Sequence, residues 1–243
     1  SARHLKRCLL ELGGKAPFIV LADADIDEAV RAAAFGAFMN QGQICMSTER
    51  IILMDEIADE FVEKLRAKAE TLVAGDPRNG NTPLGTMITA EAARRVRALV
   101  EDAAQKGAVI VCGGHARGTL IDATVIDHVT PAMRIYREES FGPLAAIIRV
   151  DSIDEAITVA NDNEYGLSSA VFSRDINQAL AVARRIETGI CHINEATVAD
   201  EPQMPFGGVK SSGYGRFGGR AAIDEFTELR WITLASGKRD YPI

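Results

Sequence analysis

The sequence contains few cysteines, and they follow no metal-binding or disulfide pattern. The four cysteines are spread over 243 residues without a C-x-x-C pair; they are Cys8, Cys45, Cys112 and Cys191. This spacing argues against a zinc site and against the disulfide framework of a small secreted protein. We therefore expect a reduced, cytoplasmic protein without a metal.

Long apolar runs and a surplus of positive charge are also missing. No segment approaches the roughly 20 apolar residues that a membrane-spanning helix needs. Lys and Arg number 27 against 34 Asp and Glu, which gives a formal net charge of −7. An acidic chain is poorly suited to a phosphate backbone, so we expect neither a membrane nor a nucleic-acid partner. The arginine pairs Arg94-Arg95 and Arg184-Arg185 fall in helical patterns and are predicted to lie on solvated faces.

The rest of the composition is that of a globular protein with two kinds of secondary structure. Hydrophobic residues make up 47% and charged residues 25% of the chain. Short apolar runs alternate with helical patterns, which predicts crossover helices between parallel strands. The predicted strands cover 18–21, 50–54, 108–112, 144–150, 169–173 and 190–194, and the predicted helices cover 25–39, 57–74, 89–106, 153–161 and 176–187. The expected fold class is α/β, with an open, mostly parallel sheet flanked by helices.

The C-terminal part follows a different pattern. Residues 205–220 contain six glycines and no sustained period, so we expect a long structured loop. Apolar residues then alternate through 226–234, which is typical of a strand with one apolar face. Such a strand needs a partner, either within this chain or in a neighbouring subunit. We therefore expect 226–243 to be an oligomerisation strand and tail, and the protein to be a homo-oligomer, either a dimer or a tetramer.

Cys45 is the first candidate for chemistry. It follows a helical pattern and a glycine-containing turn, so its sulfur can be exposed beside free backbone N–H groups. Such N–H groups can stabilise an oxyanion. A thiol with an unperturbed pKa near 8.5 is only about 3% ionised at pH 7 and needs activation. The alternative is that Cys45 is a small buried hydrophobe, as we expect the other three cysteines to be.

Glu11 is the second candidate. It interrupts an apolar segment with two glycines, residues 9–15, where an ordinary surface carboxylate is not expected. Partial burial would raise the pKa of Glu11 toward neutrality, which suits a general base. The alternative is an ordinary ion pair between Glu11 and Lys15.

Five short motifs, taken in order, resemble the aldehyde dehydrogenase superfamily. They are Leu-Glu-Leu-Gly-Gly-Lys at 10–15, Phe-x-x-x-Gly-Gln-x-Cys at 38–45, Glu-Glu-Ser-Phe-Gly-Pro at 138–143, Tyr-Gly-Leu at 165–167 and Pro-Phe-Gly-Gly-Val-Lys-Ser-Ser-Gly at 205–213. The resemblance covers essentially all 243 residues, in the order of the family. The residues after Cys45, Met-Ser-Thr-Glu-Arg, resemble members that act on aromatic aldehydes, such as salicylaldehyde, benzaldehyde and vanillin dehydrogenases.

The resemblance implies roles for individual residues. Cys45 would attack the aldehyde carbonyl, hydride would leave to a nicotinamide, and Glu11 would activate water to hydrolyse the resulting thioester. Glu139 would hold the ribose hydroxyls of the nicotinamide, and Phe141 would lie beside its ring. The backbone of Leu12 would meet its carboxamide. NAD is the expected cofactor, and NADP is left open.

The resemblance also implies an aldehyde pocket and a supporting residue. The loop 195–204 would form the entrance of the pocket. Its expected walls are Phe38, Ile44, Met46 and Phe206, all of which could equally be ordinary core residues. Asn194, at the end of a predicted strand, would either support the catalytic centre or simply cap the strand. Glu138 is expected to be a solvated surface charge.

A dinucleotide-binding half, which the resemblance places before residue 10, is missing from the sequence. No phosphate-binding glycine motif precedes Glu11, and the chain does not begin with Met. We expect 1–14 to be the end of that half, 15–225 the catalytic thiol domain and 226–243 the oligomerisation segment. The chain alone is then expected to be truncated, inactive as a dehydrogenase and apolar where the missing half would cover it.

Three other functions compete with the oxidation of an aldehyde to an acid. A CoA-acylating relative would share the fold, although Glu11 favours water as the acyl acceptor. A cysteine-dependent esterase would need Cys45 but no cofactor. The third is a non-enzymatic fragment that oligomerises through 226–236.

Overall fold

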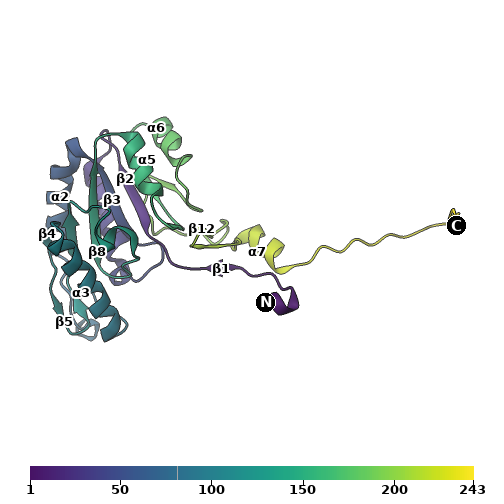
Figure 1. Cartoon of the computed structure of the whole chain (residues 1–243), viewed down its shortest axis with the longest axis horizontal. Coiled ribbons are helices and arrows are strands. Elements are labelled where there is room, and N and C mark those ends of the chain that lie inside the picture. Colours follow the sequence, from purple (N-terminus) through teal and green to yellow (C-terminus); the bar gives the residue numbers. More distant parts are fainter. Residues whose placement is uncertain (81) are drawn as a thin grey trace.

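A seven-stranded sheet forms the centre of the computed structural model, which describes residues 1–80 and 82–243 (Figure 1). In spatial order its strands are β11 (His192–Ile193), β10 (Ala170–Phe172), β2 (Ala16–Val20), β3 (Thr48–Met54), β8 (Leu144–Val150), β7 (Thr124–Asp127) and β4 (Val109–Cys112). All neighbours pair in parallel except β4 and β7, which are antiparallel. The predicted open, mostly parallel sheet is therefore confirmed.

Helices cover both faces of the sheet (Figure 1). The face covered by two helices carries α1 (Ile26–Phe38) and α2 (Asp55–Glu70), and the other carries α3 (Ala90–Gln105), α5 (Ile153–Asn161) and α6 (Ile176–Ala183). Because side chains alternate along a strand, each strand supplies both cores. Ile51 and Leu53 pack in the core with α1 and α2, whereas Ile52 packs in the opposite core.

Small elements connect and extend this framework. They are the short helix α4 (Arg134–Arg137), the 3-10 helices η1 (Ala2–His4), η2 (Met39–Gly42) and η3 (Pro77–Asn79), and the pairs β1 (Leu10–Glu11) with β13 (Gly213–Tyr214), β5 (Ala116–Arg117) with β6 (Leu120–Ile121), and β9 (Tyr165–Gly166) with β12 (Val209–Lys210). Among the residues that the structure describes, no helix is long and apolar enough to cross a bilayer.

Helix starts agree with the sequence better than helix ends do. The side chain of Asp25 accepts the N–H of Glu28, and Thr89 accepts the N–H of Ala92, as their capping positions predict. The predicted ends at 74 and 187 are too late, since α2 ends at Glu70 and α6 at Ala183. The apolar period runs on through the following turns, so it does not mark the last helical residue.

Of the two partners expected for the C-terminal segment, the structure shows none within the described part of this chain. Residues Gly219–Phe226 form the helix α7, and 227–243 run away from the body as unpaired extended chain (Figure 1). Leu229 and Leu234 are 104% and 94% exposed. A strand needs a neighbour for its backbone groups, and this chain offers none there. Pairing with a second copy stays a prediction. The loop predicted over 205–220 also contains the short strands β12 and β13.

Four neighbouring strands bring distant loops together at one edge of the sheet. β10, β2, β3 and β8 are adjacent and parallel, so their amino ends lie along the same edge. Leu167 precedes β10, Gly14 precedes β2, Cys45 precedes β3, and residues 139–141 precede β8. The topology therefore gathers the predicted functional segments at this edge.

Candidate active site

Cys45 lies in a tight loop between α1 and β3. Asn40, Gln41 and Gly42 all have left-handed backbone angles, with φ of 49°, 57° and 66°. A Cβ atom on Gly42 would overlap the carbonyl oxygen of Gly142, so only glycine fits this contact. The loop before Cys45 is therefore packed, backbone against backbone, on the segment that leads into β8.

The Cys45 side chain belongs to a small apolar cluster of its own. The other members of this Cys45 cluster are Ile44, Met46, Leu167, Ile190, Val198, Phe206 and Phe217. Three of the four predicted pocket walls, Ile44, Met46 and Phe206, are thus brought to Cys45. Phe38 is not among them, because it is buried in the core between the sheet and helices α1 and α2.

The surroundings of Cys45 oppose its ionisation. Burial raises the pKa of the Cys45 thiol, and the negative charges of Glu11 and, more weakly, Glu139 raise it further. The backbone N–H groups of Cys45 and Met46 act in the opposite direction. The backbone N–H groups expected beside the sulfur thus stabilise its charged form, but burial and the carboxylates outweigh them and the pKa of the thiol is raised.

A short β ribbon holds Glu11 near Cys45. It lies on β1, opposite Gly213 of β13. Its Oε1 is buried and has no hydrogen-bond partner in the described part of the chain. Burial raises the pKa of Glu11, and the positive charge of Arg216 partly offsets this. The predicted direction of the shift is confirmed, and a carboxylate with a raised pKa and a free oxygen can act as a base.

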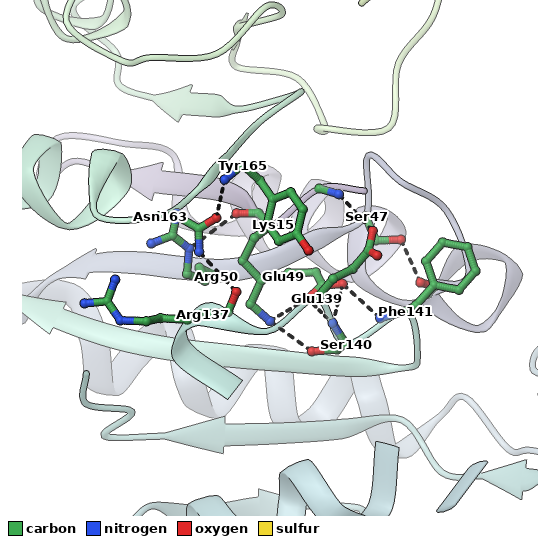
Figure 2. A network of polar contacts seen from close by, with 12 residues as sticks. Lys15, Ser47, Glu49, Arg50, Arg137, Glu139, Ser140, Phe141, Asn163 and Tyr165 are labelled. Carbon is green, nitrogen blue, oxygen red and sulfur yellow. Dashed lines mark hydrogen bonds and ion pairs between the residues drawn. The ribbon is translucent and has the colours of Figure 1, made fainter. Parts of the chain in front are cut away.

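Lys15 is not the ion-pair partner of Glu11. Its Nζ lies 2.5 Å from Oε2 of Glu49 and donates to Oγ of Ser140 at 3.0 Å (Figure 2). Lys15, Glu49 and Ser140 are all buried. The alternative of an ordinary Glu11–Lys15 pair is therefore wrong, because β2 carries Lys15 into contact with β3.

The loop before β8 places Glu139 and Phe141 beside the glycine pair. Oε1 of Glu139 accepts the N–H of Gly14 at 2.8 Å, and a Cβ atom on Gly13 would lie 2.8 Å from Oε2. Burial raises the pKa of Glu139, and the Gly14 N–H lowers it. Phe141 has a left-handed backbone with φ of 46°, which costs on the order of 1–3 kcal/mol for such a residue. Strain of this kind is typical of a binding site.

Glu138, next to this loop, is a solvated surface charge, as predicted. Its carboxylate is 45% exposed and pairs with Arg134 at 2.7 Å. Leu12 is likewise exposed, and its N–H donates to the carbonyl oxygen of Ser212 at 3.1 Å. The side chain of Glu138 is thus solvated, while the backbone of Leu12 is anchored beside Glu11.

Asn194 supports a strand end rather than the nucleophile. Its Oδ1 accepts the N–H of Ser173 at 3.0 Å, and its Nδ2 donates to the carbonyl oxygen of Ser173 at 2.9 Å. These two bonds connect the end of β11 with the end of β10. The geometry favours the capping alternative.

Three charged residues of the site were missed by sequence reasoning. Glu49 accepts backbone N–H groups of the loop before β8, and Arg216 acts on the pKa of Glu11. Arg95, predicted to be solvated, donates to the carbonyl oxygens of Glu139 and Ser140 at 2.7 Å and 3.0 Å. One sequence feature could have identified Glu49, because it is a charged residue at the start of an apolar strand. No sequence feature could have identified Arg95, because only tertiary packing shows what a helix surface faces.

A cavity of about 620 Å³ opens beside the Cys45 cluster. Its apolar walls include Ile190, Val198, Met204 and Phe206, and its charged residues are Glu195, Asp200 and Glu201. Ile190, Val198 and Phe206 belong to the Cys45 cluster as well, so the cavity and the cluster share part of their walls. The predicted entrance loop 195–204 forms much of its wall. Within residues 1–80 and 82–243, no cluster of His, Cys, Asp or Glu is arranged to hold a metal ion.

Comparison with known proteins agrees with this geometry. The model of the aldehyde dehydrogenase family matches residues 1–232. A vanillin dehydrogenase from Pseudomonas fluorescens is 59% identical over 243 residues, which are 100% of this chain and 50% of that protein. A salicylaldehyde dehydrogenase from Pseudomonas sp. strain C18 is 56% identical, again over 100% of this chain and 50% of that protein.

The fold is shared with solved structures as well. The crystal structure of a salicylaldehyde dehydrogenase from Pseudomonas putida G7, complexed with salicylaldehyde, matches with a TM-score of 0.96 and 56% identity. The match covers 100% of this chain and 50% of that chain, so the chain spans about half the length of these relatives. On the family match, the sequence identity and the shared fold, the chain belongs to the aldehyde dehydrogenase family.

Proposed function

We propose that the protein carrying this chain oxidises an aldehyde to a carboxylic acid with Cys45 as the nucleophile. The observation that carries the proposal is the convergence of Cys45, Glu11 and Glu139, since both carboxylates lie close enough to raise the pKa of the thiol. The Cys45 thiol passes its proton to Glu11, from which it reaches solvent, and the resulting thiolate adds to the carbonyl carbon while the backbone N–H groups of its loop stabilise the oxyanion. Loss of hydride from this thiohemiacetal leaves a thioester.

Glu11 completes the cycle by hydrolysis. Its raised pKa and its free Oε1 suit a base that takes a proton from water. The resulting hydroxide attacks the thioester carbon, the carboxylic acid leaves and the Cys45 sulfur is released. This role makes water, rather than the thiol of CoA, the proposed acyl acceptor.

A nicotinamide cofactor, when bound, accepts the hydride. The residues of this chain fit the nicotinamide end of such a molecule. Glu139 is partly buried next to the thiol and lies over Gly13, where any side chain would intrude. Glu139 would bind the ribose hydroxyls, Phe141 would flank the ring, and the exposed backbone at Leu12 would meet the carboxamide. NAD is the cofactor to test first, with NADP as the alternative.

An aromatic aldehyde is the proposed substrate. The support is the names of the relatives, vanillin and salicylaldehyde dehydrogenases, and the apolar walls of the cavity at Phe206 and Met204. Ile44 and Met46 extend those walls toward Cys45. Phe38 is no longer proposed as a wall.

We also propose a separate role for each of three segments of the chain. Residues 1–14 would complete a dinucleotide-binding half, 15–225 would form the thiol domain, and 226–243 would mediate oligomerisation. The 243 residues on their own are then incomplete and should not reduce NAD. The half-length match to relatives supports this expectation.

Two assays test the function. The native protein that carries these residues should reduce NAD with salicylaldehyde or vanillin, and Cys45→Ala should abolish the reaction. The 243-residue chain should hydrolyse p-nitrophenyl acetate slowly, with loss of turnover in Cys45→Ala but not in Cys112→Ala, a cysteine at the far edge of the sheet on β4. A native protein that oxidises aldehydes equally well after Cys45→Ala would contradict the proposal.

A further inference from the structure

A buried ion pair supports the loop that carries Glu139 and Phe141 (Figure 2). The Lys15 and Glu49 side chains are 0% and 3% exposed, with 2.5 Å between Nζ and Oε2. A buried pair of charges adds little net stability, because removing both ions from water offsets their attraction. Stability therefore does not explain the pair, and its contacts with the loop at 139–141 indicate another role.

Glu49 binds the N–H side of that loop. Its carboxylate accepts the N–H of Ser140 at 2.7 Å and the N–H of Phe141 at 3.0 Å. The backbone of Phe141 is left-handed, a conformation that an aromatic residue rarely adopts. The hydrogen bond from Phe141 to Glu49 therefore stabilises a backbone that the local sequence disfavours.

Arg95 binds the carbonyl side of the same loop. Its guanidinium donates to the carbonyl oxygens of Glu139 and Ser140. Glu49 lies on β3 and Arg95 on α3, so two separate elements hold the backbone of 139–141. Lys15 adds a third contact through Oγ of Ser140 at 3.0 Å.

The segment that carries Lys15 also holds the carboxylate of Glu139. That carboxylate accepts the N–H of Gly14, and Lys15 is the next residue along the same segment. One short run of chain therefore contacts Glu139 through its backbone and Glu49 through its side chain. The Lys15–Glu49 pair is therefore linked to the carboxylate of Glu139 through two adjacent residues.

We propose that Lys15 and Glu49 are positioning residues that fix the carboxylate of Glu139 for the cofactor. Neither residue touches the reacting atoms; Glu49 acts through the backbone of 139–141, and Lys15 acts through Glu49 and through Oγ of Ser140. The functional part of this inference rests on the proposed role of Glu139. The structural part, that Glu49 orders 139–141, stands without it.

Glu49→Gln is the test variant, because it keeps the size of the side chain and removes its charge. Asp127→Asn is the matched control. Asp127 is 3% exposed and pairs with Arg149 at 2.8 Å on β7, away from the loop. Both variants change a buried, ion-paired carboxylate to an amide. Arg149 keeps Asp55 and Asp59 as partners, whereas Glu49 is the only carboxylate paired with Lys15 in the described part of the chain, so the control matches the substitution but not the loss of a sole partner.

Amide hydrogen exchange of a peptide covering 139–143, in the 243-residue chain, is the first measurement. Glu49→Gln should speed exchange about tenfold or more, the factor expected for losing hydrogen bonds to a charged group. Asp127→Asn should leave this peptide unchanged. Equal exchange at 139–143 in the two variants would overturn the proposal.

Steady-state kinetics of the native protein that carries these residues is the second measurement. Glu49→Gln should raise KM for NAD about tenfold, as expected when a binding group is displaced. Cofactor-free ester hydrolysis at Cys45 should change less than about twofold, because its groups stay in place. A parallel fall in both reactions would indicate a merely structural role and would overturn the proposal.

The double variant Lys15→Met Glu49→Gln separates charge balance from positioning. It removes both buried charges, so it should regain the thermal stability that Lys15→Met alone loses. It should not regain the wild-type KM for NAD, and a regained KM would overturn the proposal. If the native protein reduced no NAD at all, the proposed function would fail, while hydrogen exchange would still decide whether Glu49 orders 139–141.

Discussion

The carbonyl oxygen of Cys45 occupies the space that a side chain on Gly14 would need. This contact joins the segment that follows Glu11 to the loop that carries Cys45. The same residue donates its N–H to Glu139. Glu11, Cys45 and Glu139, the residues proposed for the chemistry, are therefore connected through the backbone at Gly14.

The two glycines should respond differently to alanine. A Cβ atom on Gly14 meets rigid backbone, so Gly14→Ala should lower the free energy of unfolding by about 1–3 kcal/mol and reduce ester hydrolysis at Cys45. A Cβ atom on Gly13 meets the Glu139 carboxylate, which can rotate away. Gly13→Ala should cost less stability and act mainly on KM for NAD. Urea unfolding and the ester assay check both, and a larger loss of stability in Gly13→Ala would contradict this account.

Removing the charge of Glu11 should make Cys45 more reactive toward alkylation. The negative charge of Glu11 raises the pKa of the Cys45 thiol. In Glu11→Gln that pKa should fall, so the iodoacetamide reaction should begin to accelerate at a lower pH. The measurement is the alkylation rate between pH 6 and pH 10 (roughly the range in which thiols titrate), read by peptide mass.

Glu139→Gln is the control for that experiment. The effect of Glu139 on the thiol is in the same direction and smaller than that of Glu11. The pKa of Cys45 should therefore fall less in Glu139→Gln than in Glu11→Gln. An unchanged pH profile in Glu11→Gln would mean that Glu11 does not lie close enough to act on the sulfur.

The C-terminal segment should pair with a second copy of the chain. Trp231 is the only tryptophan in the sequence and is 90% exposed in the single chain. Pairing would bury it, so its fluorescence emission should shift to shorter wavelength as the protein concentration rises. A chain that ends at Phe226 should have a lower mass by light scattering. Unshifted emission together with an unchanged mass would argue against this interface.

Breaking the buried pair from one side should destabilise the fold strongly. Lys15→Met leaves Glu49 charged and without its ammonium partner, which typically costs about 3–5 kcal/mol. Lys15→Met Glu49→Gln removes both charges and should recover most of that loss. Urea unfolding of the two variants gives the comparison, and similar losses in both would show that the charge of Glu49 is satisfied without Lys15.

Much of the fold could be predicted because strands and helices leave local patterns. The predicted β8 and α5 agree with the structure residue for residue, and the caps at Asp25 and Thr89 are confirmed. The partner of the C-terminal strand could not be predicted, because alternation shows only that a segment can pair. Whether a partner strand lies beside it is not a local property.

The residues of the site likewise comprise some that the local sequence identifies and others that only the packed structure reveals. Cys45 and Glu11 could be singled out because a thiol in a glycine turn and a charge among leucines are unusual in themselves, and their motifs resemble those of a family. Phe38 was misplaced, and Glu49, Arg95 and Arg216 were missed, because each acquires its role from residues far away in sequence. Local residue chemistry and the resemblance thus sufficed for the family and for the direction of the Glu11 pKa shift. The raised pKa of the Cys45 thiol depended on burial and on charges from distant segments. Which charges hold the loop at 139–141 depended on the parallel order of β10, β2, β3 and β8, because these contacts arise only when the chain is packed.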